Sequence, residues 1–212
     1  MKKHSTLTPR IFLFYKTTCI ISLLFFSKLY PQSTPLKNTF TKVISVIYGN
    51  LNTDTLPDKV CIFQDTIDKT QPYKLLVLFA QPGNTYHSIV SSTKIIDPRF
   101  PNGPDGLQNG NGFGSISINR RTLIISSELL RGHYEYKLRY QHGNFELIGY
   151  TYVCSNGLGE IHSIDFNLST GDRHEINQRY DRDEIISDIK KKIQIKPLPK
   201  LQDIKPFENE LY

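Results

Sequence analysis

The sequence predicts a mainly β domain, an antiparallel sheet arranged as a sandwich or as a barrel-like sheet, with one short C-terminal helix. The chain is rich in Tyr, Ile, Val and Thr, residues that suit a pleated surface. From Thr41 onward, short apolar runs alternate with turn residues about every eight to twelve positions, which is typical of antiparallel sheets. With 38% apolar and 22% charged residues, the composition is that of an ordinary globular protein.

The expected strands are short and evenly spaced. They are Lys42–Tyr48, Lys59–Gln64, Lys74–Ala80, Tyr86–Ser91, Gly114–Ile118, Thr122–Ser126, His133–Tyr140, Phe145–Cys154, Ile161–Asn167 and His174–Asn177. Two tight turns are predicted between neighbouring strands, at 119–121 and at 141–144, where Gly143 and Asn144 tolerate a positive φ.

The hairpin around residues 141–144 has the clearest alternation in the chain. Tyr134, Tyr136, Leu138 and Tyr140 alternate with polar residues, so we expect these four side chains to face the core. On the returning strand the apolar parity changes, which predicts a β-bulge near residues 148–149.

Two later segments differ from this pattern. Residues 97–113 are dense in Pro and Gly, which predicts a long surface loop. In Asp183–Ile193, isoleucines recur every four residues, at 185, 189 and 193, which predicts a short amphipathic helix. Pro197–Leu201 should then be extended. Lysines 190–192 are expected to form a solvated face rather than a lipid contact.

The first 33 residues have the pattern of an export signal. A basic start precedes an apolar block, whose uninterrupted part at 19–26 is too short for a spanning helix but suits a signal-peptide core. We therefore expect a periplasmic or secreted protein, with an uncleaved membrane anchor as the alternative. The predicted organisation is a leader at 1–33, a β-rich domain at 34–180, and a helix with an extended tail at 181–212.

Charge argues against a nucleic-acid partner. Residues 1–33 hold five of the 26 Lys and Arg residues and no acid, so the rest of the chain carries 21 basic against 20 acidic residues. A phosphate-binding surface needs a concentrated excess of Lys and Arg.

A polar loop between the first two expected strands is a candidate calcium site. Side-chain oxygens recur at Asn50, Asn52, Asp54 and Asp58, and the Leu56 carbonyl could add a ligand. The spacing resembles the calcium loops of dockerin and FG-GAP-type repeats. Asn50 replaces a carboxylate and Thr55 replaces the turn glycine, so weak binding is expected, and a hairpin turn without a cation is the alternative.

The chain also resembles an uncharacterised family of exported bacterial proteins. Their "GDxNxDxxxD" opening is similar to residues 49–58, and their "fRYqxgxwxLIG" hairpin is similar to 138–149, with Phe145 where an aromatic residue is usual. The resemblance implies an exported β-rich domain, and it carries over no catalytic residue.

Without the leader, two cysteines remain, Cys61 and Cys154, each in a strand-like run. An oxidising compartment would permit a disulfide between them. Two free thiols are the alternative.

The sequence favours a non-enzymatic binding module, whose partner would be a protein or an envelope glycan contacted through the 97–113 loop. A periplasmic inhibitor or immunity protein is a second hypothesis. A hydrolase of envelope polymers is a third, and it would need two converging carboxylates. Its candidate residues are Glu128, Glu135, Glu146 and Glu160. Glu160 and His162 share a strand face, and a surface pair is expected there rather than a metal site. Calcium is the only cofactor predicted.

Overall fold

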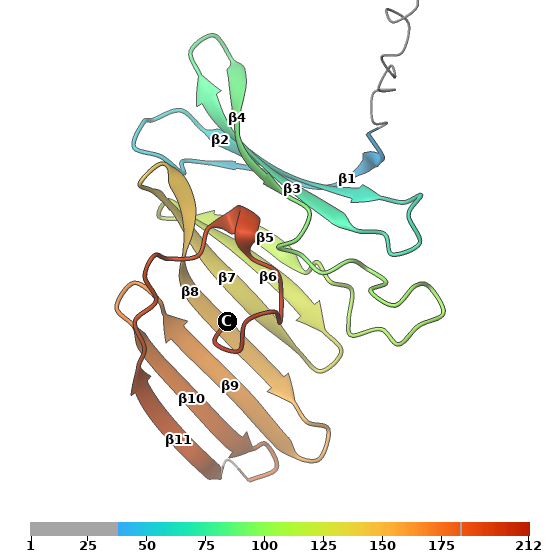
Figure 1. Cartoon of the computed structure of the whole chain (residues 1–212), viewed down its shortest axis with the longest axis vertical. Coiled ribbons are helices and arrows are strands. Elements are labelled where there is room, and N and C mark those ends of the chain that lie inside the picture. Colours follow the sequence, from blue (N-terminus) through green and yellow to red (C-terminus); the bar gives the residue numbers. More distant parts are fainter. Residues whose placement is uncertain (1–37, 183) are drawn as a thin grey trace, which may run out of the picture. The chain divides into compact units, whose positions relative to one another are not determined.

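Antiparallel strands form two separate sheets in the structure, a computed structural model that describes residues 38–182 and 184–212 (Figure 1). The smaller sheet is a meander of β1 (Phe40–Gly49), β2 (Asp58–Asp65), β3 (Tyr73–Gln81) and β4 (Thr85–Ser92). The larger sheet is a second meander of β5 (Ser115–Asn119), β6 (Thr122–Leu129), β7 (Gly132–Gln141), β8 (Asn144–Ser155), β9 (Glu160–Asn167), β10 (Asp172–Arg179) and β11 (Ile185–Lys192). The mainly β prediction is confirmed, and neither sheet closes on itself.

The strongest sequence pattern is confirmed in detail. Tyr134, Tyr136 and Leu138 on β7 are fully buried, and Tyr140 is partly buried against the same core. The β7–β8 register shifts between Lys137 and Leu138, where β8 carries one extra residue, Ile148. This is the predicted bulge, which moves the apolar residues of β8 to the other parity and keeps them on the core face.

One apolar core joins both sheets. It contains Leu75 and Val77 from β3 together with the aromatic residues of β7. The sheets approach closely at one corner, where a Cβ on Gly49 of β1 would lie 3.2 Å from the Ile118 side chain of β5. The loop that follows β1 therefore lies over the end of the large sheet, close to the β5–β6 turn.

The C-terminal segment completes the core. After β11 the chain crosses in front of β7 and β8 (Figure 1), and it includes the short 3-10 helix η2 (Leu201–Asp203). Leu201 and Ile204 are buried, and Tyr134 packs edge-to-face on Phe207 with ring centroids 5.2 Å apart. This segment lies between the two sheets, since η2 contacts both β4 and β8.

The helix predicted at Asp183–Ile193 is wrong, because Ile185–Lys192 forms the edge strand β11. Isoleucine at every fourth position fits a strand as well as a helix, and β-branched residues favour the strand. Pairing with β10 supplies backbone partners that the sequence pattern could not reveal. The described helix, η2, lies further along the chain.

The predicted leader, residues 1–33, lies outside the described residues, so cleavage and anchoring stay predictions. No helix in the described ranges is long and apolar enough to cross a membrane.

Candidate functional site

The β1–β2 loop, the candidate calcium loop, is organised by its own hydrogen bonds. Asp58 is fully buried, and its carboxylate accepts the backbone N–H groups of Leu51 at 2.8 Å and of Ala80 at 3.1 Å. Ala80 lies on β3, so this carboxylate fastens the loop to the small sheet. Both oxygens of Asp58 therefore already have protein partners.

The exposed part of the loop is a pair of Asx turns. Asn52 Oδ1 accepts the N–H of Asp54 at 2.8 Å, and Asp54 Oδ1 accepts the N–H of Leu56 at 2.9 Å. Asn50, at the start of the loop, is exposed. In residues 38–182 and 184–212 no group of three His, Cys, Asp or Glu side chains could hold a metal ion.

Calcium binding at this loop stays a prediction. A ligand that binds only the folded state raises the unfolding midpoint. Thermal unfolding with millimolar calcium should show such a rise, and Asp54→Ala should abolish it. An unchanged midpoint would establish the loop as a hairpin turn without a cation.

A pocket of about 490 Å³ lies beside this loop, at the corner where the two sheets approach. It combines residues of the β1–β2 loop with residues from the end of the large sheet. Its lining residues are Leu51, Asn52, Thr53, Arg120, Arg121, Arg139 and Tyr140. Three arginines and no acidic residue thus face one cavity, which we call the arginine pocket.

Two of the arginines occupy the β5–β6 turn in an unusual conformation. Arg120 has φ 47° and Arg121 has φ 63°, so both lie in the left-handed region. A two-residue turn of this type normally takes Asn-Gly, because a Cβ makes the left-handed region unfavourable. Arginine at both positions costs conformational energy, and such strain is often retained where it serves a function.

The third arginine comes from a neighbouring strand. Arg139 on β7 pairs with Thr122 on β6, which is the first residue after the turn. Its guanidinium donates a hydrogen bond to Thr122 Oγ1 at 3.2 Å. Tyr140 packs edge-to-face on Phe79 with ring centroids 4.8 Å apart, so this wall of the pocket is part of the core.

The arginine pocket carries positive charge, and its nearest acidic neighbour in the sheet is Glu146, which lies opposite Arg139 in the β7–β8 register and accepts a hydrogen bond from Gln141. Within the described ranges, none of the three guanidinium groups forms an ion pair. A guanidinium presents a planar set of N–H donors that matches two oxygens of a carboxylate, sulfate or phosphate group. The pocket can therefore hold an oxyanion.

The sequence did not reveal this arrangement. Residues 119–121 were expected to form a turn, and that prediction is confirmed. Arg139 reaches the same place through the β6–β7 register, which aligns residues far apart in the chain. The pairing could have been derived from the hairpin pattern, whereas the position of the β1–β2 loop depends on the packing of the two sheets.

Of the two alternatives for Cys61 and Cys154, the structure has the free thiols and not the disulfide. Cys61 lies on β2 of the small sheet and Cys154 on β8 of the large sheet. The sequence pattern places each cysteine in a strand, but it does not show which sheet that strand joins.

Cys154 instead lies near the predicted pair Glu160 and His162, which share a face as expected. The three line a second pocket of about 460 Å³, together with Tyr152 and Asn177. Burial, with a smaller contribution from the charge of Arg173, lowers the pKa of His162.

The four carboxylates of the hydrolase hypothesis have separate surroundings. Their carboxylates accept hydrogen bonds from different amide side chains: Glu128 from Asn111, Glu146 from Gln141, and Glu160 from Asn156. Glu135 faces away from the core side of β7, because Tyr134 and Tyr136 on either side of it face inward.

In comparisons with protein-family models, with curated proteins and with solved structures, nothing matches this chain. The resemblance to the exported bacterial family therefore stays a prediction.

Proposed function

We propose that this protein is an exported, non-enzymatic binding module that holds an acidic group of an envelope glycan in the arginine pocket. One observation carries the proposal: Arg120, Arg121 and Arg139 line one cavity without an acidic partner in the described ranges. An oxyanion would supply the missing negative charge.

The other lining groups support a sugar as the carrier of that charge. The cavity, at about 490 Å³, lies within the 300–1,000 Å³ that is usual for small-ligand sites. Among the lining residues Thr53 offers a hydroxyl and Tyr140 offers part of an aromatic ring. A polyphosphate such as nucleic acid fits less well, because the chain beyond the leader is almost neutral.

Export supports the choice of an envelope glycan, and it rests on the leader pattern at 1–33. The protein should be recovered outside the cytosol and shortened by about 26–33 residues, the span of the leader. Full-length protein in the cytosol would contradict export, and full-length protein in the membrane fraction would identify the leader as an anchor.

Calorimetry tests the binding site itself. Titration with a trigalacturonate should give measurable heat, and a neutral galactose trisaccharide should give none. A sulfated oligosaccharide and inorganic phosphate, run in parallel, distinguish the kind of oxyanion. Arg139→Gln should weaken binding by roughly ten- to a hundredfold, the value of one hydrogen bond to a charged group.

A matched control separates the pocket from general charge. Arg131 lies in the β6–β7 turn, at the opposite end of β6 from the pocket. Arg131→Gln removes the same charge and should leave binding unchanged. Equal losses in both variants, or no heat with any oxyanion, would contradict the proposal.

The strained turn gives a second test. Replacing Arg120 by Asn and Arg121 by Gly supplies the residues that this turn type prefers. The double variant should be more stable by about 1 kcal/mol because the left-handed strain is relieved, and it should lose binding. A more stable protein that binds equally well would show that the two arginines do not contact the ligand.

A further inference from the structure

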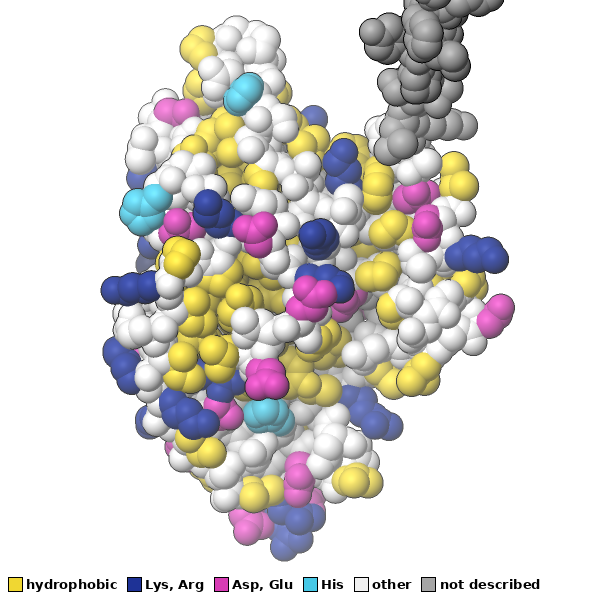
Figure 2. All heavy atoms as spheres, in the orientation of Figure 1, with side chains coloured by type: hydrophobic (Ala, Val, Ile, Leu, Met, Phe, Trp, Pro, Cys, Tyr) yellow, Lys and Arg dark blue, Asp and Glu magenta, His cyan; other side chains and the backbone are white. Residues whose placement is uncertain are grey.

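The free edge of the large sheet is long and only partly protected. β11 ends the strand order, and no strand of the described ranges pairs with its outer edge. It exposes three isoleucines, Ile185, Ile186 and Ile189, at 58%, 50% and 40%. The other end of this sheet, β5, lies against β1. Lysine and arginine side chains, with hydrophobic ones between them, follow the margin of the molecule where β11 lies (Figures 1 and 2).

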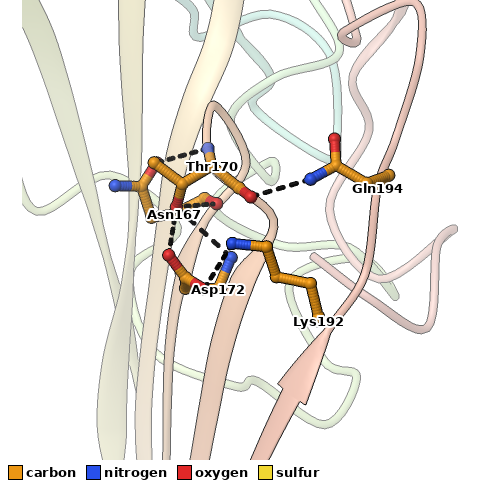
Figure 3. A network of polar contacts seen from close by, with 5 residues as sticks. All are labelled: Asn167, Thr170, Asp172, Lys192 and Gln194. Carbon is orange, nitrogen blue, oxygen red and sulfur yellow. Dashed lines mark hydrogen bonds and ion pairs between the residues drawn. The ribbon is translucent and has the colours of Figure 1, made fainter.

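This edge strand is fixed at both ends. At its end, Lys192 Nζ donates to Asp172 at 2.8 Å, and Gln194 Nε2 donates to the Thr170 carbonyl at 2.8 Å (Figure 3). At its start, the N–H of Arg179 donates to the Glu184 carbonyl at 2.8 Å. The unpaired backbone groups are therefore held in an extended row, as a template for another strand.

The register of β11 shows which residues face outward. The N–H of Ile193 bonds the Gly171 carbonyl, so this pair is hydrogen-bonded. Hydrogen-bonded and non-hydrogen-bonded pairs alternate along an antiparallel ladder. The backbone groups of Ile189 and Lys191 therefore bond β10, whereas those of Asp188 and Lys190 point to the free edge.

The geometry points to a second copy of this chain as the occupant of the edge, with the two β11 strands antiparallel about a two-fold axis through Ile189. In this register Asp188 lies opposite Lys190 of the other copy. The backbone N–H and C=O groups of these two residues point toward each other, so they form the hydrogen bonds between the copies. Two symmetric opposite-charge pairs then flank an Ile189–Ile189 contact, and each of these cross-strand pairs stabilises the sheet.

Charge selects this register over its neighbours. A shift by two residues in one direction places Asp188 opposite Asp188. A shift in the other direction places Lys190 opposite Lys190. It also brings Asp188 opposite Lys192, whose ammonium group already pairs with Asp172. Both shifts juxtapose like charges, which is destabilising. A shift by one residue brings outward-facing backbone groups opposite inward-facing ones, so no ladder forms.

Sedimentation over a wide concentration range tests the proposal on the purified protein. We expect a weak dimer, since one strand edge buries less than the roughly 1,600 Å² of a standard interface. Asp188→Lys and Lys190→Asp should each raise the dissociation constant at least about tenfold by creating like-charge pairs. The double variant carrying both changes should dimerise like the wild type.

A control isolates the contact that Asp188 makes within its own chain. Asp188 Oδ1 lies 2.7 Å from His174 Nε2. His174→Ala removes this contact, keeps the carboxylate at the edge, and should leave the dimer intact. Unfolding midpoints of all variants show whether the chain still folds.

Cross-linking tests directly whether the two-fold axis passes through residue 189. Ile189→Cys should form an interchain disulfide under mild oxidation, well above the background from Cys61 and Cys154 in the wild type. Ser187→Cys should not, because residue 187 lies opposite residue 191 of the other copy. A monomer at all concentrations would overturn the proposal and identify the lysines as protection of the edge. A dimer unaffected by the charge variants would overturn it in favour of another surface.

Discussion

Strands β7 and β10 belong to the same sheet, yet their core-side faces are chemically opposite. The cross-strand pairs Tyr136–Tyr150, Tyr150–Phe166 and Phe166–Arg173 lie on one continuous face. On β7 this face is fully buried and apolar. On β10 it carries Arg173, Glu175, Asn177 and Arg179.

The difference follows from what covers each part. The small sheet and the C-terminal segment bury the face of β7, so hydrophobic burial stabilises it. The face of β10 relies on local polar contacts, such as the Arg173–Glu175 ion pair and the hydrogen bond from Asn177 to Ser187 at 2.9 Å. One sheet thus combines an apolar, covered region with a margin held by polar contacts, which are buried at Arg173 and exposed at Lys192.

The largest effect should come from the β7 face. Leu138→Ala should lower the free energy of unfolding by about 2–5 kcal/mol, because it leaves a cavity in the core. Asn177→Ala, on the same face of β10, should cost no more than about 1 kcal/mol. Denaturant unfolding measures both, and equal losses would remove the distinction between the two regions.

Asp58 is the polar exception in the well-covered region. Asp58→Ala should cost about 3 kcal/mol, because it leaves the N–H groups of Leu51 and Ala80 without their acceptor. Asp54→Ala, in the exposed part of the same loop, serves as the control and should cost less than about 1 kcal/mol. A small loss at Asp58 would mean that water replaces its carboxylate.

A smaller effect concerns Asp97, at the start of the 97–113 loop, whose carboxylate accepts a hydrogen bond from the Tyr134 hydroxyl at 3.1 Å. Burial raises the pKa of Asp97 above its ordinary value, although the Tyr134 hydrogen bond and Lys205 oppose this. The folded state therefore holds the proton more tightly, and wild-type stability falls as pH rises through this pKa.

Asp97→Asn keeps an acceptor and removes the charge. The variant should gain stability relative to the wild type, on the order of 1 kcal/mol at neutral pH, and the gain should vanish below about pH 4, near the ordinary Asp pKa. Unfolding curves at several pH values measure this difference. A gain independent of pH would contradict the titration of Asp97.

The smallest effect should lie at the margin. Lys192→Ala removes the ion pair with Asp172, which is exposed, so the loss should stay within about 0.5 kcal/mol and shrink in high salt. A loss above 1 kcal/mol, unaffected by salt, would show that this turn is more than a surface contact.

The sequence predicted those parts of the fold that depend on residues close together in the chain. The alternation at 134–140, the bulge at Ile148 and the turns at 119–121 and 141–144 depend on neighbouring residues, and the structure confirms them. The β11 strand and the separation of Cys61 from Cys154 depend on which strands pair and which sheet each joins. The arginine pocket depends on both sheets together, so no local pattern could reveal it.

The position of the C-terminal segment has a consequence for synthesis. Leu201 and Ile204 fill the space between the sheets from the last dozen residues of the chain. The core therefore cannot be completed until residues 201–204 have been synthesised. All eleven strands in the described part of the chain precede this segment, so the two sheets have to wait for it before the apolar space between them is filled.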